Sequence, residues 1–247
     1  MAVAADVLEA RTRAVRLLRR LADCQDGTGN LRDPLTGQPL APSHYAVSLF
    51  AGACAMSGEE DLREPAERAV RYFLGLPARV RGAPELNNLG LLAVYRVWAR
   101  TLPDELRGRL TSYFLRMPFA SLTGRATNNW HAMRAVCLVQ RGLALGRAAD
   151  VEAARRCMYH EVLPLQDGSG LFADYPARGS TGDRCTPLTY HAKFCAMLAM
   201  VLSDLPDSQI QEALGRGVVA LAQLCAPDGE TLYFGRSCNS LYGYAAA

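Results

Sequence analysis

Two short clusters of amide, imidazole and phenol side chains contain the residue types of proton-transfer chemistry. They are Asn128-Asn129-Trp130-His131 and Tyr190-His191, and a later segment adds Arg236. Elimination beside a carboxylate needs a donor that neutralises the carboxylate, a base for the α-proton and an acid for the leaving oxygen. An asparagine amide supplies N–H donors without adding charge, and imidazole titrates near neutral pH. These clusters therefore indicate an elimination site.

We predict five catalytic residues from these clusters: Asn129, His131, Tyr190, His191 and Arg236. Asn129 is the predicted neutralising donor. His131 or His191 is the candidate base, and Tyr190 or Tyr242 is the candidate acid. Either tyrosine would act as the base if a neighbouring Arg236 lowered its pKa. The predicted substrate-binding residues are Asn128, Trp130, His44, Tyr45, Asn88, Lys193, Tyr175, Asn239 and Tyr242.

The elements that must position these residues are helices of two alternating kinds. Some segments are apolar nearly all the way round, which is typical of helices buried on every side, and the segments between them are amphipathic. The predicted inner helices cover 43–57, 85–101, 128–145, 187–203 and 239 onward, and the outer ones 3–24, 59–75, 103–116, 148–163 and 207–225. Thr127 or Asn128 is the expected N-cap of the third inner helix. The pattern predicts an all-α fold.

The polar residues of the inner helices lie almost entirely at their N-terminal ends. If the inner helices run parallel, these ends meet at one mouth of a closed ring, whereas a solenoid would spread its polar residues along a concave face. Turns with an Asp-Gly pair recur after outer helices, at 25–27, 166–168 and 227–229. We therefore predict one α/α-toroid domain over residues 1–247, small or incomplete, with about five outer–inner hairpins.

These turns and clusters resemble those of the α/α-toroid superfamily. Asn128-Asn129-Trp130-His131 is similar to the Asn-Asn-x-His segment of alginate-lyase and heparinase-like polysaccharide lyases. Tyr190-His191 and the stretch from Arg236 to Tyr242 resemble the later Tyr, His and Arg residues of such lyases. The squalene-cyclase and prenyltransferase-like toroids are more distant, because the acidic DxDD and DDxxD motifs are absent. The resemblance implies a lyase.

Composition excludes several other classes. A net charge of +3 without a basic run argues against nucleic acid, and no apolar stretch reaches the ~20 residues of a membrane span. The eight cysteines show no metal-type spacing, so we expect reduced thiols in a cytoplasmic protein, with no metal and no cofactor. Parallel helix N-termini at one mouth would favour an anionic substrate.

We therefore expect a metal-independent lyase that acts on an acidic sugar or a small carboxylated metabolite. The alternatives are a cyclase or isomerase of a biosynthetic pathway and a non-catalytic helical scaffold. Loop 164–186 is long for a connection in a compact domain, so we interpret it as a lid or rim over the site. The last predicted helix, from Asn239, is short, so we expect an oligomer or a second chain that completes the ring.

Overall fold

The computed structural model describes residues 2–42, 44–82, 84–117, 127–175 and 186–225. It divides into two compact units, Met1–Met117 and Pro118–Ala247. All regular secondary structure in the described ranges is helical, and β-pairing there is limited to isolated bridges in loops. The prediction of a single domain over 1–247 stays a prediction.

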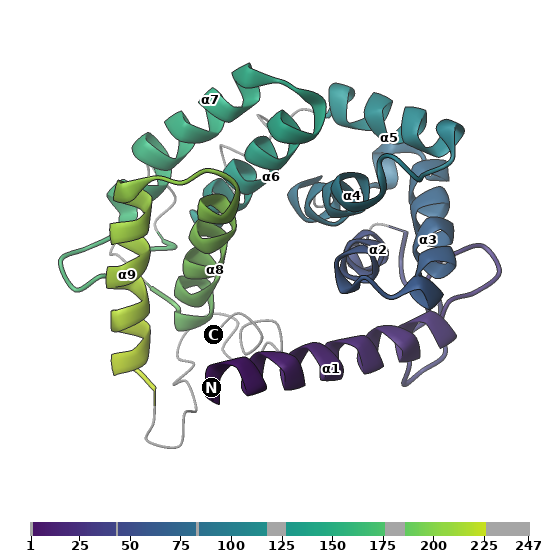
Figure 1. Ribbon diagram of the computed structural model, residues 1–247, viewed down its shortest axis with the longest axis horizontal. Coiled ribbons are helices and arrows are strands. Elements are labelled where there is room, and N and C mark those ends of the chain that lie inside the picture. Colours follow the sequence, from purple (N-terminus) through teal and green to yellow (C-terminus); the bar gives the residue numbers. More distant parts are fainter. Residues whose placement is uncertain (1, 43, 83, 118–126, 176–185, 226–247) are drawn as a thin grey trace. The chain divides into compact units, whose positions relative to one another are not determined.

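Unit 1 packs two apolar helices against each other and covers them with amphipathic ones. The inner pair is α2 (Ala46–Ser57) and α4 (Pro84–Trp98). α3 (Arg63–Gly75) covers α2, and α5 (Asp104–Arg116) contacts both α3 and α4. The 3₁₀ turns η1 (Glu60–Leu62) and η2 (Ala78–Val80) flank α3. Each outer helix thus buries one face against an inner helix (Figure 1).

α2 and α4 approach closely because glycines face each other where they cross. A Cβ atom added to Gly90 would lie 2.0 Å from the Ser48 carbonyl oxygen, and one added to Gly52 would lie 2.6 Å from the Gly90 carbonyl oxygen. Both obstacles are backbone atoms, which cannot move out of the way as a side chain can. Backbone contact between the two helices therefore requires glycine at both positions.

We expect Gly90→Ala to destabilise unit 1 by roughly 1–3 kcal/mol, because the new methyl group forces α2 and α4 apart. Gly108 on α5 provides the matched control, since a Cβ there meets nothing within 4 Å. Gly108→Ala should stabilise the protein by roughly 0.5–1 kcal/mol, the ordinary helix-interior difference. Urea unfolding of both variants measures the effects. Equal stability of the two variants would contradict the close-packing argument.

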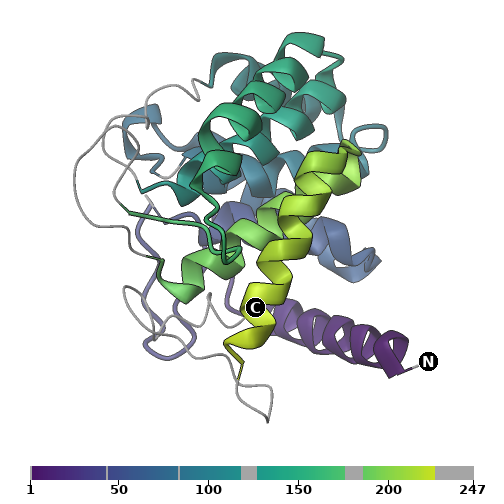
Figure 2. The same cartoon turned by 90° about the vertical axis from the view of Figure 1, so that its left-hand side faces the viewer.

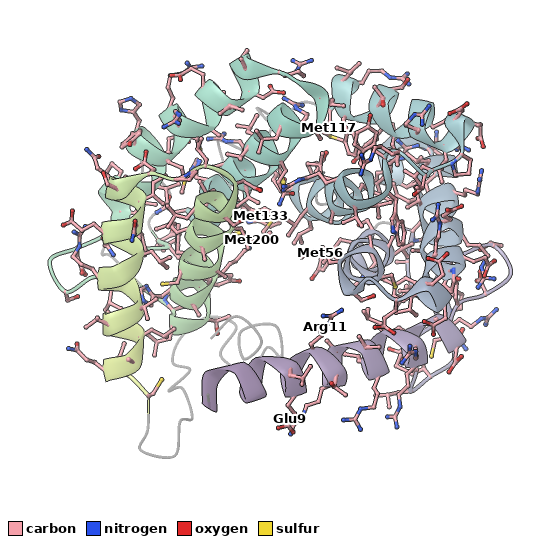
Figure 3. All side chains as sticks on the ribbon, in the orientation of Figure 1. Glu9, Arg11, Met56, Met117, Met133 and Met200 are labelled. Carbon is pink, nitrogen blue, oxygen red and sulfur yellow. The ribbon has the colours of Figure 1, made fainter. Side chains whose placement is uncertain are left out.

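α1 (Ala2–Asp23) is amphipathic, and both its apolar and its polar residues contact the rest of unit 1. Val15 and Leu18 are buried, and Arg11 donates a hydrogen bond of 2.9 Å to the carbonyl oxygen of Ser57, at the end of α2. Figure 3 shows Arg11 on the side of α1 that faces α2, with Glu9 on the opposite side. The arginine thus satisfies one of the carbonyl groups that a helix C-terminus leaves open.

Unit 2 repeats the arrangement with α6 (Asn129–Leu145) and α8 (Leu188–Asp204) as the inner pair. α7 (Ala148–Cys157) covers α6, and α9 (Ser208–Gln223) lies along α8 (Figures 1 and 2). α7 continues into a π-helical turn, Met158–Val162, and a 3₁₀ turn, Leu163–Leu165. Every α6 residue from His131 to Gly142 is buried, as expected for a helix packed on all sides.

The predicted inner helices at 43–57, 85–101, 128–145 and 187–203 are confirmed to within a few residues by α2, α4, α6 and α8. The fifth, from 239 onward, lies outside the described residues. The described cysteines are free thiols, and burial raises the pKa of Cys54 to about 12. Among the described helices, none has the length and apolar character needed to cross a membrane.

The Asp-Gly turns predicted from the sequence form the same structure in both units. Asp26 Oδ1 accepts from the backbone N–H and hydroxyl of Thr28, and Asp167 Oδ1 accepts from the same groups of Ser169. The side-chain amide of the preceding glutamine, Gln25 or Gln166, donates to the loop and to a carbonyl of the next outer helix. Each loop is thereby fixed to the outer helix that follows it. The third turn, at 227–229, lies outside the described residues.

Candidate functional site

A side chain from a distant loop caps the N-terminus of α6. Asp174 Oδ1 accepts a 2.9 Å hydrogen bond from the backbone N–H of Asn129, and the Asp174 carbonyl accepts from the backbone N–H of Asn128. The expectation that Thr127 or Asn128 would cap this helix with its own side chain is wrong: Asn128 occupies the N-cap position, but its amide donates to the Ala173 carbonyl instead. A carboxylate at this position also suits the positive end of the helix dipole.

The side chain of Asn129 joins Asp174 to a buried cation. Its amide nitrogen donates to Asp174 Oδ1 and to the hydroxyl of Thr127, each at 2.6 Å. Its amide oxygen accepts a 2.7 Å hydrogen bond from Lys193 Nζ on α8. Both amide hydrogens are thus used inside the protein, so Asn129 is placed to orient its neighbours. The bond to Lys193 also brings the N-terminal ends of α6 and α8 together, as the toroid prediction requires.

Trp130 supports the Lys193 ammonium from a second direction. Nζ lies 4.9 Å from the centre of the Trp130 ring, within the range of a cation–π contact. Lys193 is only 4% exposed, so this ring and the Asn129 amide together stabilise a charge that would be costly to bury alone. Trp130 itself is half-buried. We define the Asp174 cluster as Thr127, Asn129, Trp130, Asp174 and Lys193.

The second oxygen of Asp174 is the exception in this otherwise well-bonded cluster. Asp174 is 1% exposed, yet its Oδ2 has no hydrogen-bond partner among the described residues. A buried polar atom without a partner costs free energy, and such atoms in native proteins often have a functional explanation. Oδ1 already accepts two N–H bonds, so Oδ2 is the oxygen of this carboxyl group whose hydrogen-bonding capacity stays unused within the described part of the chain.

His131 lies on a different face of α6 and contacts the outer layer. Its Nδ1 is 2.6 Å from Oε2 of Glu161 in the π-helical turn, and the same oxygen accepts from Arg134. The backbone carbonyl of His131 accepts from the thiol of Cys157 at 3.4 Å. These contacts link α6 to the end of α7. A catalytic role for His131 stays a prediction.

His191 is fully buried, and both of its ring nitrogens bond to backbone groups. Nδ1 accepts from the Phe172 N–H at 3.2 Å, and Nε2 donates to the Gly217 carbonyl on α9 at 2.9 Å. The ring also lies against Phe172, which itself stacks on Phe194. Burial lowers the pKa of His191, opposed by its bond to the Gly217 carbonyl. These contacts hold loop 166–172 to α8 and α9, and the catalytic assignment stays a prediction.

The lowered pKa of His191 predicts a stability loss in mild acid. The unfolded state takes up a proton at about pH 6.5, whereas the folded state keeps the ring neutral to a lower pH. The contribution of His191 is therefore complete above about pH 6.5 and falls as the pH drops toward the folded pKa. Urea unfolding at pH 7.5 and 5.5 measures the difference. His191→Asn keeps an acceptor near the Phe172 N–H without a titrating ring, so its pH dependence should be smaller; an unchanged pH dependence would contradict the prediction.

The remaining predicted residues are distributed over both units. In unit 1, the exposed His44 accepts from the Ala46 N–H and stacks on Tyr45, whereas Asn88 is fully buried and donates to the Pro84 carbonyl. In unit 2, Tyr175 is exposed and directly follows Asp174, and the half-buried Tyr190 lies three residues before Lys193 on α8. Arg236, Asn239 and Tyr242 lie outside the described residues.

Loop 164–186 contributes buried groups as well as surface. Its described part runs to Tyr175, and there Phe172 is fully buried in the core of unit 2. Asp174 follows two residues later, and the predicted sets of catalytic and substrate-binding residues do not include it. Asp174 and Lys193 each form a hydrogen bond with the Asn129 amide. The rest of the predicted lid lies outside the described residues.

The alternation of inner and outer helices defines the fold class, the α/α toroid, as predicted from the sequence. No known family model matches this sequence, and no curated protein matches it either. Among solved structures, the chain is similar to unsaturated glucuronyl hydrolase from Bacillus sp. GL1, an enzyme responsible for the degradation of glycosaminoglycan. The TM-score is 0.62 at 14% identity, over 92% of this chain and 72% of that one. The similarity confirms the fold.

Within the described ranges, no group of three or more His, Cys, Asp or Glu side chains is arranged to hold a metal ion. The buried carboxyl groups of unit 2 are separated along α6. Asp174 caps its first turn, whereas Asp150 pairs with Arg141 near its last turn. The Asp174 cluster is therefore the candidate site of this unit.

Proposed function

We propose that this protein is a sugar-acting enzyme that hydrolyses a glycosidic bond, with Asp174 as the proton donor. The observation that carries the proposal is the Asp174 carboxyl group, buried and held through Oδ1, with Oδ2 lacking a partner among the described residues. Glycoside hydrolysis requires a carboxylic acid that protonates the leaving oxygen. The likeness in fold to a glucuronyl hydrolase supports the same class of reaction.

In the proposed reaction, the proton on Asp174 Oδ2 passes to the glycosidic oxygen as the bond from that oxygen to the anomeric carbon breaks. The oxygen of a water molecule forms the new bond to the anomeric carbon, and the proton that this water loses passes through solvent to restore the acid form of Asp174. Asn129 keeps Oδ1 occupied with two N–H bonds, so Oδ2 is the oxygen that carries the proton in this scheme.

Elimination is the second candidate, and the spacing on α8 favours it. Tyr190 and Lys193 are three residues apart, so their side chains lie on one face of the helix. A phenol and an ammonium on one face are suitable for removing a proton beside a neutralised carboxylate. In this scheme Lys193 takes over the neutralising role predicted for Asn129. A lyase on an acidic sugar therefore remains the alternative proposal.

One assay separates the two reactions. The protein is incubated with a panel of glucuronyl-containing and other uronide oligosaccharides, and both new reducing ends and absorbance of a conjugated double bond are followed. Hydrolysis should release reducing ends without a gain in absorbance, whereas elimination should increase both. Absence of both signals on every uronide, and of new reducing ends on neutral oligosaccharides tested beside them, would refute both candidates.

A further inference from the structure

Arg81, directly after η2, lies over two aromatic rings that pack α3 against α5. Its guanidinium carbon is 5.4 Å from the centre of the Phe73 ring and 5.7 Å from the centre of the Tyr113 ring, both within the range of a cation–π contact. The two rings are buried and pack edge to face, with their centres 5.5 Å apart. The guanidinium is therefore held in place by two helices of unit 1.

The protein uses only part of the hydrogen-bonding capacity of this guanidinium. Nη2 of Arg81 donates a 2.9 Å hydrogen bond to the carbonyl oxygen of Leu74, near the end of α3. Nε is buried and has no hydrogen-bond partner among the described residues, and Nη1 donates to none of them. A buried donor without a partner costs free energy, and such a group in a native protein calls for an explanation. An acceptor from outside the described chain would provide one.

Two exposed arginines of α5 flank the Tyr113 ring on which Arg81 lies. Arg109, Tyr113 and Arg116 are spaced four and three residues apart, so they share one face of the helix. Burial lowers the pKa of the Arg81 guanidinium, and the positive charges of Arg109 and Arg116 lower it further, against the opposing effect of Tyr113. Three guanidinium groups are thus brought together around one ring.

Acidic side chains do not balance these charges. Glu105 is bonded to Arg109 at 3.0 Å, but its other oxygen is bonded to Arg71 at 2.7 Å. Arg81 and Arg116 form no ion pair within the described part of the chain. Packing alone does not require a charge at position 81, because an uncharged methionine would fill the same space between the rings. The excess of positive charge therefore indicates a site for an anion.

We propose that Arg81, Arg109 and Arg116 form a binding site for a phosphate or sulfate group. A guanidinium can donate two parallel hydrogen bonds to the oxygens of such a group. A doubly charged anion offsets three guanidiniums better than a single carboxylate does. The aromatic rings keep Arg81 in one conformation, so little side-chain entropy is lost when the anion binds. This inference goes beyond the proposed function and does not depend on it.

Isothermal titration calorimetry on the wild-type protein tests the site directly. Inorganic phosphate, inorganic sulfate and acetate are titrated at one ionic strength, so that charge screening is the same for all three. Phosphate and sulfate should bind saturably, with one site per chain, and acetate should bind more weakly. Equal affinity for the three anions, or no saturable binding of phosphate and sulfate, would overturn the proposal.

Glucose 6-phosphate distinguishes the two possible sources of the anion. Tighter binding of glucose 6-phosphate than of inorganic phosphate would mean that the site takes a phosphate group carried by a larger molecule. Equal or weaker binding would mean that it takes the free oxyanion. Both results retain the site.

Two neighbouring arginines provide a variant and its matched control. Arg81→Met should weaken phosphate binding about 10- to 100-fold, the usual worth of a hydrogen bond to a charged group. Arg79→Met removes the same charge from an exposed position of η2 and should leave phosphate binding unchanged. An equal loss in both variants would mean that net charge alone attracts the anion, and would refute the assignment.

A third variant keeps the test conclusive if Arg81→Met does not fold. Arg116 is exposed, and among the described residues its guanidinium bonds only to the Ser112 carbonyl of its own helix. Arg116→Met should therefore fold normally, as circular dichroism can verify. It should weaken phosphate binding roughly 2- to 5-fold, the worth of an exposed charge. Wild-type affinity in this variant would show that Arg116 does not face the anion, and the three-arginine site would be refuted.

Discussion

Asp174→Asn is expected to lower the rate of glycosidic cleavage about 10²- to 10⁴-fold, the usual loss when a positioned acid is removed. The substitution is nearly isosteric: the remaining amide oxygen still accepts from the backbone N–H and side chain of Asn129. What the substitution removes is the proton that the proposed acid would donate. The effect should therefore fall on kcat, with KM close to that of the wild type. Steady-state kinetics on a cleaved uronide measures both.

The control for Asp174→Asn is its melting temperature. Because Asp174→Asn keeps the cap on α6, this variant should melt close to the wild type. Asp174→Ala removes the cap and should lower the free energy of unfolding by about 1 kcal/mol, so its melting temperature should be lower. Wild-type turnover by Asp174→Asn would show that another group donates the proton, and the proposed role of Asp174 would fail.

The second large effect is on stability and concerns the opposite end of α6. Asp150, at the start of α7, is buried and pairs in a bidentate manner with Arg141, which is also buried, at 2.7 and 2.8 Å. Arg147 approaches the same carboxylate from the more exposed side. Asp150→Ala would leave the Arg141 guanidinium in the interior without its counter-charge. Removal of one partner from a buried pair costs about 3–5 kcal/mol.

Glu152→Ala is the matched control, because Glu152 is an acidic residue on the same helix whose ion pair with Arg156 is mostly exposed. Exposed pairs contribute about 0–1 kcal/mol. Urea unfolding should therefore separate the two alanine variants clearly. If Asp150→Ala were as mild as the control, the Arg141–Asp150 pair would not be what joins α6 to α7.

The sequence predicts the helices well because a buried helix can be recognised from the apolar residues of its own segment. α6 is apolar on every side, and its predicted range of 128–145 agrees with the observed Asn129–Leu145. The same holds for α2, α4 and α8. Asn129, Trp130 and Lys193 were also predicted as site residues, and the structure brings them together. Polar residues directly before an apolar helical segment are a local feature of the sequence, so they can be recognised without knowledge of the fold.

The remaining site residues depend on information that no single stretch contains. Asp174 contacts Asn129 across 45 positions, and nothing in its own loop indicates which helix it caps. The histidines were grouped with their neighbours in sequence, but successive residues on a helix point about 100° apart. His131, two positions after Asn129, therefore meets the π-helical turn, and His191, two before Lys193, meets α9. Which neighbouring element each face of a helix contacts is determined by the fold.

The two Asp-Gly loops have a consequence for how such a chain changes over evolutionary time. Each loop presents its glutamine oxygen to an arginine of the next outer helix, Arg68 or Arg216, and that arginine pairs with a glutamate one turn earlier. Gly29 and Gly170 both have positive φ and lie where a Cβ would strike that helix. The same junction thus occurs twice, some 140 residues apart, which is the mark expected of an ancestral segment copied in tandem. If the chain gained or lost a whole outer–inner hairpin, each contact between an Asp-Gly loop and the following outer helix would be preserved. A shorter insertion would disrupt one of these contacts.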